Sequence, residues 1–189
     1  GKWAIAYGAN DATSQDAYPK LINLETKEIT NLADENGAIV SNAGDVTDDG
    51  KMVVGSYNGY PATWNPQTKE WTKVAIPEGC DAGRINAVTP DGKYAVGTCN
   101  RSSDWLYEEP VMWDLTTGKI IPVNIPKYDT SNEYQNMTRF TGLSADGRYI
   151  CGCISFSYPQ DVVYFFYDRE TSTFDPVVFD FDENAKIKY

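Results

Sequence analysis

Carboxylate side chains that could do acid–base chemistry gather in segments predicted to be loops: Asp16, Asp104, Glu108, Glu109, Asp129, Glu133 and Asp161. Most glycoside hydrolases use two carboxylates, one as the acid and one as the base or nucleophile. None of the seven recurs at a fixed place in the repeats described below, and a chain with 27 acidic residues carries such loops in any case. A carboxylate-dependent glycosidase is therefore an alternative, and solvated surface is the interpretation that we favour.

Histidine is absent from the 189 residues, which excludes His-based triads, His general bases and His-ligated metal sites. The four cysteines, Cys80, Cys99, Cys151 and Cys153, lack the paired spacing of a zinc site. Cys80 and Cys99 fall near the two ends of one predicted hairpin. A disulfide between them and a pair of buried free thiols both stay open, and free thiols are favoured.

Two acidic groups could in principle hold calcium, because calcium prefers oxygen ligands. They are 45–49, with three aspartates, and 180–183, with two aspartates and a glutamate. Neither has the spacing of an EF-hand, and both are typical of turns. We expect no metal and no cofactor.

Aromatic and arginine side chains in the predicted loops indicate a second possible role, which is ligand binding. Long connections are expected on one face of the molecule, at 9–18, 56–60, 99–109, 126–139 and 155–161. Tyr and Trp on such loops offer large contact area at low entropic cost. The candidate ligand-binding residues are Tyr18, Tyr57, Tyr60, Arg101, Trp105, Tyr107, Tyr128, Tyr134, Arg139 and Tyr158. The alternative is that these rings fold back onto their own loops.

The elements that position these residues come from a repeat. The phrase Asp49-Gly50-Lys51 returns as Asp91-Gly92-Lys93 and as Asp146-Gly147-Arg148, each time followed by an apolar strand that contains a glycine. A later phrase ends in Trp64-Asn65, Trp113-Asp114 or Tyr167-Asp168. The Asp-Gly element predicts a tight turn with Gly in the left-handed conformation, and the regular aromatic is predicted to pack in the core.

Each unit is predicted to hold four antiparallel strands, the plan of a β-propeller blade. In the third unit these are 86–89, 93–97, a strand ending at Trp113, and 119–123. The N-terminal copy lacks the strand before Asp-Gly. The chain is thus expected to be all-β, one domain over 1–189 with approximate repeats 1–42, 43–84, 85–139 and 140–189. It forms either a small closed ring of four blades or a segment of a larger propeller.

The repeats resemble known families. Thr89-Pro90-Asp91-Gly92-Lys93, with the later 113–119, is similar to the TolB-like and WD-like propeller repeats of bacterial envelope proteins. The segment 49–55, with Ala62-Thr63-Trp64, is similar to the extracellular HAF-type repeat. The resemblance implies a propeller and an extracellular or periplasmic location. It rests on turn and core residues, so it transfers no catalytic residue.

Composition narrows the partners. The formal net charge of −11 disfavours a nucleic-acid phosphate backbone. No apolar run reaches the roughly 18–20 residues of a membrane span. The sequence therefore favours a non-catalytic domain that binds a protein or a carbohydrate through its long-loop face. The alternatives are an accessory domain of a larger hydrolase, joined to the rest of a longer chain, and the glycosidase.

Overall fold

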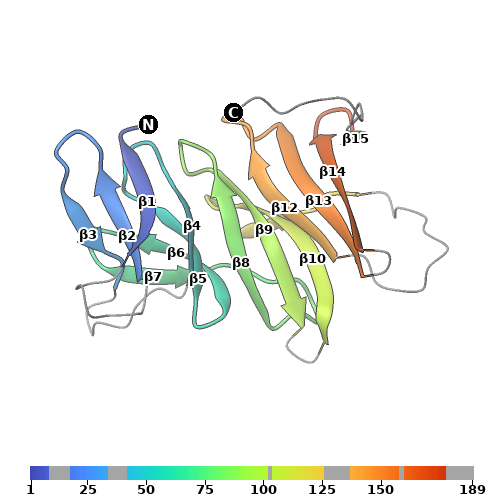
Figure 1. Cartoon of the computed structure of the whole chain (residues 1–189), viewed down its shortest axis with the longest axis horizontal. Coiled ribbons are helices and arrows are strands. Elements are labelled where there is room, and N and C mark those ends of the chain that lie inside the picture. The colour runs from blue at the N-terminus through green and yellow to red at the C-terminus, as the bar shows by residue number, and fades with distance from the viewer. Residues whose placement is uncertain (9–17, 34–41, 102–103, 126–136, 158–159, 178–189) are drawn as a thin grey trace, which may run out of the picture.

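The computed structural model describes residues 1–8, 18–33, 42–101, 104–125, 137–157 and 160–177, and every regular element in these ranges is a β-strand (Figure 1). The first sheet has three strands, β1 (Trp3–Gly8), β2 (Tyr18–Asn23) and β3 (Ile29–Asn31). The second has β4 (Asn42–Val46), β5 (Val53–Tyr57), β6 (Tyr60–Asn65) and β7 (Glu70–Lys73).

The third sheet has β8 (Ala82–Val88), β9 (Tyr94–Arg101), β10 (Asp104–Asp114) and β11 (Lys119–Ile121). The fourth has β12 (Met137–Leu143), β13 (Tyr149–Ser157), β14 (Gln160–Asp168) and β15 (Thr173–Val177). Within each sheet the strands pair antiparallel in chain order. The all-β fold of repeated antiparallel sheets is confirmed, and the first sheet has three strands within the described residues.

Side-chain hydrogen bonds build the Asp-Gly turn in the same way in three sheets. In the third, Thr89 Oγ1 donates to Asp91 Oδ1 (2.6 Å) and accepts from the backbone N–H of Tyr94 (2.9 Å). Asp91 also accepts from the N–H of Lys93, and Gly92 has φ +74°, as the turn requires. The corresponding hydroxyl–carboxylate pairs are Thr47 with Asp49 (2.8 Å) and Ser144 with Asp146 (2.5 Å). We call the surface with these turns the turn face.

The regular aromatics pack in the core, as the repeat predicts. Trp64, Trp113 and Tyr167 are 1%, 0% and 3% exposed. The three hydrophobic clusters to which they belong lie between neighbouring sheets. Burial of these rings therefore holds one sheet against the next, and the indole N–H of Trp113 is satisfied by the carbonyl of Ala75 (2.6 Å).

The first strand of each four-stranded sheet, here called the inner strand, also bonds to its neighbour. Asp45 on β4 accepts from the N–H of Val88 on β8 (3.1 Å), and Asn86 on β8 donates to the carbonyl of Phe140 on β12 (2.7 Å). The Tyr7 hydroxyl joins the first sheet to Ala43 of the second. These bonds fix the inner strands relative to one another.

The four sheets lie in a row, with the first and fourth at opposite ends of the long axis (Figure 1). Contacts between sheets join β1 with β4, β4 with β8 and β8 with β12. The described strands thus form an open array rather than a closed ring. In the sequence, Asn184-Ala185-Lys186-Ile187 resembles Asn86-Ala87-Val88-Thr89 and could therefore supply a strand that closes a ring, but 184–187 lies outside the described residues.

The inner strand of the third sheet is longer than the sequence indicated. β8 begins at Ala82 rather than Asn86. The sequence did not indicate the longer strand, because a bulge between Ile85 and Ala87 interrupts the alternation of side chains. The repeat boundaries proposed at 43, 85 and 140 accordingly fall inside inner strands. This extension matters because it places Arg84 on a strand.

The expected long loops 99–109 and 155–161 are also corrected. β9 and β10 extend to Arg101 and from Asp104, and β13 and β14 extend to Ser157 and from Gln160. The segment 56–60 contains a two-residue hairpin turn, formed by Asn58 and Gly59 with φ of +51° and +79°. Cross-strand pairing satisfies the backbone N–H and C=O groups of these segments. The sequence prediction had assigned them to loops because they are rich in polar and aromatic residues. The segments 9–17 and 126–136 lie outside the described residues.

Candidate functional site

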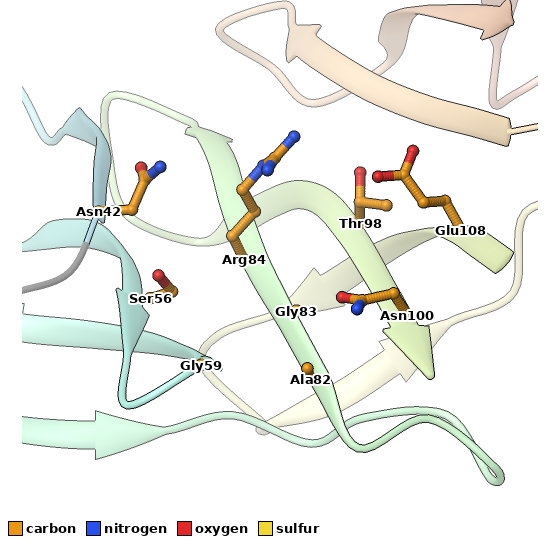
Figure 2. A pocket seen from close by; sticks show the side chains of 9 residues that line it. All are labelled: Asn42, Ser56, Gly59, Ala82, Gly83, Arg84, Thr98, Asn100 and Glu108. Carbon is orange, nitrogen blue, oxygen red and sulfur yellow. The ribbon is translucent and has the colours of Figure 1, made fainter. Parts of the chain in front are cut away.

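The surface opposite the turn face, where the inner strands begin, has a hollow of about 220 Å³ between the second and third sheets (Figure 2). We call this surface the strand-start face. The second sheet contributes Asn42, Ser56 and Gly59 to the hollow. The third contributes Ala82, Gly83, Arg84, Thr98, Asn100 and Glu108. The lining therefore combines hydroxyl, amide, guanidinium and carboxylate groups, and none of its described residues is aromatic.

One repeat position supplies a polar side chain from three successive inner strands. Asn42, Arg84 and Arg139 each stand eight residues before the glycine of the Asp-Gly turn. Each also precedes the residue paired with the strand glycine, respectively Gly55, Gly97 or Gly152. The repeat thus directs equivalent side chains to the same face, and two of the three are arginines.

Arg139 and Glu108 form an ion pair at the edge of the hollow. The Nε of Arg139 donates to Glu108 Oε2, and the two side chains are 34% and 14% exposed. The hydrogen bond to Glu108 is the main cause that raises the pKa of Arg139. Glu108 therefore has its charge compensated by Arg139.

Arg84 differs from Arg139 in its hydrogen-bond and ion-pair partners. Its Nε donates to Asn86 Oδ1 (3.1 Å), and among the described residues it has no ion-pair partner. In Figure 2 its guanidinium extends from β8 on the same side of the sheet as the Thr98 and Glu108 side chains. Because guanidinium donors form a planar fork, these terminal nitrogens suit an oxyanion.

Thr98 has a hydroxyl that no other described residue hydrogen-bonds. The side chain is 3% exposed, and its Oγ1 has no hydrogen-bond partner among the described residues. Ser56, at the equivalent position of the second sheet, is also buried and also lines the hollow. A buried hydroxyl without a hydrogen-bond partner costs free energy. A ligand that forms a hydrogen bond with this hydroxyl removes that cost, and the removal favours binding.

Two of the predicted binding residues pack against their own sheet. The Tyr57 ring stacks on Trp71 with centroids 4.9 Å apart, and Lys73 Nζ lies 3.9 Å above the Tyr60 ring. Both contacts are with β7 of the same sheet. These contacts hold the two rings against β7 rather than against their own loop.

Two further predicted residues, Tyr18 and Arg101, lie at strand ends on the strand-start face. Tyr18 begins β2 and Arg101 ends β9, and both are half-buried. Trp105 and Tyr107 lie in β10, although their side chains are outside the described part. Tyr128, Tyr134 and Tyr158 lie outside the described residues. Of the ten, only Arg139 directly contacts a residue of the hollow by a described ion pair.

Arg84, Asn42, Ser56, Thr98 and Asn100 were not predicted from the sequence. The signal that could have found Arg84 is its spacing, since Arg84 precedes Gly92 by the same eight residues that separate Arg139 from Gly147. The signal for Thr98 is its place directly after the strand glycine, shared with Ser56.

The cysteines are free thiols, with Cys80 and Cys99 buried. Burial is the main cause that raises the pKa of Cys80 to about 11 and that of Cys99 to about 12. A thiol must lose its proton to act as a nucleophile, so neither cysteine is suited to nucleophilic catalysis near neutral pH. The favoured prediction of buried free thiols holds for this pair.

The predicted carboxylates are used structurally where they are described. Glu108 pairs with Arg139, and Glu109 Oε2 lies 3.8 Å from the Cys80 sulfur. Asp45 and Asp49 accept turn and inter-sheet hydrogen bonds rather than forming an empty cage. Among the residues that the structure describes, no group of three or more Cys, Asp or Glu side chains could hold a metal. Asp16, Asp129 and Glu133, and the acidic group 180–183, lie outside that part, as do the side chains of Asp104 and Asp161.

No helix in the described ranges has the length and apolarity needed to cross a bilayer. The long apolar runs of the chain are the strands already assigned to sheets.

Comparison with known proteins supports the fold. No protein-family model matches the chain, and a search of curated proteins gave no significant match. Among solved structures, TolB from Acinetobacter baumannii aligns with a TM-score of 0.63 at 19% identity, over 94% of this chain and 41% of that one. A protein described as TolB from Agrobacterium tumefaciens aligns with a TM-score of 0.59 at 11% identity, over 93% of this chain and 61% of that one.

The β-propeller domain of Cps50 (Swd1) from Myceliophteria thermophila aligns with a TM-score of 0.52 at 12% identity, over 94% of this chain and 52% of that one. The chain thus spans between about two fifths and three fifths of these proteins. At such low identities the alignments show the fold alone. The described sheets are blades of a β-propeller fold.

Proposed function

We propose that the chain is a non-catalytic binding domain that engages a protein or a glycan through its strand-start face. The observation that carries the proposal is the hollow between the second and third sheets. There a buried hydroxyl without a partner, at Thr98, lies among amide and guanidinium groups from two sheets. Propellers position loops and strand ends rigidly, and convergent polar groups on a rigid frame suit recognition.

An extracellular or periplasmic location is part of the same proposal. It is supported by the resemblance of the turn and core motifs to envelope propeller repeats and by the alignment with TolB proteins. The net charge of −11 supports a partner other than nucleic acid.

The experiment is an NMR titration of the isotope-labelled chain with sets of soluble oligosaccharides and short peptides. Binding at the hollow shifts the backbone amides of Ser56, Thr98 and Asn100, while those of Thr47, Thr89 and Ser144 on the turn face stay unchanged. Shifts confined to the turn face would contradict the proposal. Mass spectrometry of the recovered probes tests the non-catalytic part, because cleaved oligosaccharide would favour the glycosidase instead.

A second candidate, an accessory part of a larger propeller protein, is favoured by one face of the fourth sheet. Phe166 occupies the position of Met112, since each precedes the core aromatic of its strand. Met112 is fully buried beneath the fourth sheet, whereas Phe166 is 54% exposed. The occupant that fits Phe166 is a further blade of the same repeat, because that is what covers Met112.

Light scattering behind size exclusion tests this second candidate. An uncovered blade face makes the isolated chain self-associate, and Phe166→Asp restores a mass near 21 kDa. Ile29→Asp, at a residue 60% exposed on the first sheet, is the matched control. A wild-type chain that is already a stable monomer counts against this candidate.

A further inference from the structure

The charges around the hollow identify the chemistry of its ligand. Glu108 is compensated by Arg139, and the remaining ionic group in the lining is Arg84. Among the described residues, the hollow therefore has one positive charge without an ion-pair partner, in a chain whose net charge is −11. A cation placed so against the overall charge favours an anionic ligand group and discriminates against a neutral one.

The hydrogen-bonding groups of the hollow fit a carboxylate. A carboxylate takes two parallel hydrogen bonds from a guanidinium fork, and its remaining lone pairs accept from hydroxyls. Arg84 supplies the fork, because its Nε donates to Asn86 and its terminal nitrogens have no hydrogen-bond partner in the described part of the chain. Thr98 supplies a hydroxyl donor that has no other described acceptor.

Size and lining favour a peptide as the bearer of that carboxylate. The hollow of about 220 Å³ lies below the ~300 Å³ low end of small-molecule pockets, so it fits one terminal unit of a longer ligand. Sugar recognition commonly uses an aromatic platform, and the lining residues that the structure describes include none. The amide side chains of Asn42 and Asn100 instead offer the paired donor and acceptor that a peptide group requires.

We propose that the hollow binds the C-terminal carboxylate of a peptide, with Arg84 as the main anion ligand and Thr98 as a hydroxyl donor. The inference rests on the proposed binding function and deepens it. Arg139 is a positioning residue, since it acts on the site through Glu108.

The test is a titration with acetyl-Ala-Ala-Ala bearing a free carboxylate and with the same peptide bearing a C-terminal amide, followed by NMR at Thr98 and Asn100. Hydrogen bonds to charged groups contribute about 1.5–3 kcal/mol, so the amide binds at least about tenfold more weakly. Arg84→Gln reduces affinity for the free acid to that of the amide. Arg84→Lys keeps the charge without the fork and restores part of the affinity.

Lys51→Gln on the turn face is the control for a general loss of positive charge, and it leaves the affinity unchanged. Unfolding curves of the variants establish that each is folded. Equal affinity for acid and amide overturns the inference, as does an Arg84→Gln variant that binds normally. Glucuronate and glucose form a parallel pair: preferential binding of glucuronate, without binding of the peptide acid, overturns the peptide assignment. If none of the four probes binds while other ligands shift the strand-start face, this inference fails and the binding function stands.

Discussion

Thr89 and Thr98 are both almost fully buried in the third blade, yet they lie toward opposite faces and differ in what their hydroxyls do. On the turn face, Thr89 Oγ1 donates to Asp91 and accepts from two backbone N–H groups. On the strand-start face, Thr98 Oγ1 has no described partner. The turn face is saturated by its own repeat, which makes it structural. The strand-start face retains unused polar groups, which makes it the candidate for binding.

The largest effect is expected from the frame of the strand-start face. A Cβ at Gly97 would lie 2.1 Å from the carbonyl oxygen of Arg84 and 2.8 Å from the Cα of Ile85, both backbone atoms that cannot rotate away. Gly97→Ala should therefore lower the free energy of unfolding by about 3 kcal/mol or more, measured by urea denaturation. Gly118→Ala on the turn face is the control, with no atom within 4 Å of the added carbon but a φ of +70°, and should cost about 1 kcal/mol. Similar losses for the two variants would show that the close approach is not tight.

The next largest effect is expected from removing a side-chain hydrogen-bond acceptor on the turn face. Thr89→Val keeps the shape of the side chain but leaves the N–H groups of Lys93 and Tyr94 without their hydroxyl acceptor. We expect a loss of about 1–3 kcal/mol in the free energy of unfolding. A neutral Thr89→Val variant would remove the distinction between the two faces.

The same substitution at Thr98 is expected to behave differently. Thr98→Val removes a hydroxyl that has no described partner, so the free energy of unfolding should stay within about 0.5 kcal/mol or rise. Its affinity for the peptide acid should nevertheless fall. A Thr98→Val variant as unstable as Thr89→Val would mean that Thr98 has a structural role.

The smallest expected effect is a loss of fold stability at acidic pH. Hydrogen bonds from Arg148 lower the pKa of Asp168 to about 2. Because a depressed carboxyl pKa stabilises the fold above its unfolded value near 4, this contribution should fade as pH falls from about 4 toward 2. Side-chain hydrogen bonds likewise lower the pKa of Asp91 and Asp146. Thermal unfolding followed between pH 6 and pH 2.5 should show this decline, and Asp168→Asn should flatten it. An unchanged slope in that variant would assign the acid sensitivity to other groups.

Much of the fold could be predicted because its determinants are local. An Asp-Gly turn is specified by the φ that Gly92 can adopt and by the reach of Thr89 and Asp91 side chains to nearby backbone. The regular aromatics, such as Trp113, revealed the packing of sheets because burial of a large ring recurs with the repeat. The absence of histidine set firm limits on the chemistry.

The binding candidate depended on contacts between distant segments, which only the tertiary structure decided. The bulge beside Asn86 concealed that Arg84 is on a strand, because it breaks the period of two on which strand prediction relies. Glu108 could be recognised as an acid from the sequence, but its pairing with Arg139 of the next sheet could not. Thr98 is one of many threonines until packing buries it without a partner. The sequence by itself determined a repeat of blades, since turns and core positions are local. The tertiary structure decided which polar groups remain unused, since that depends on how neighbouring blades meet.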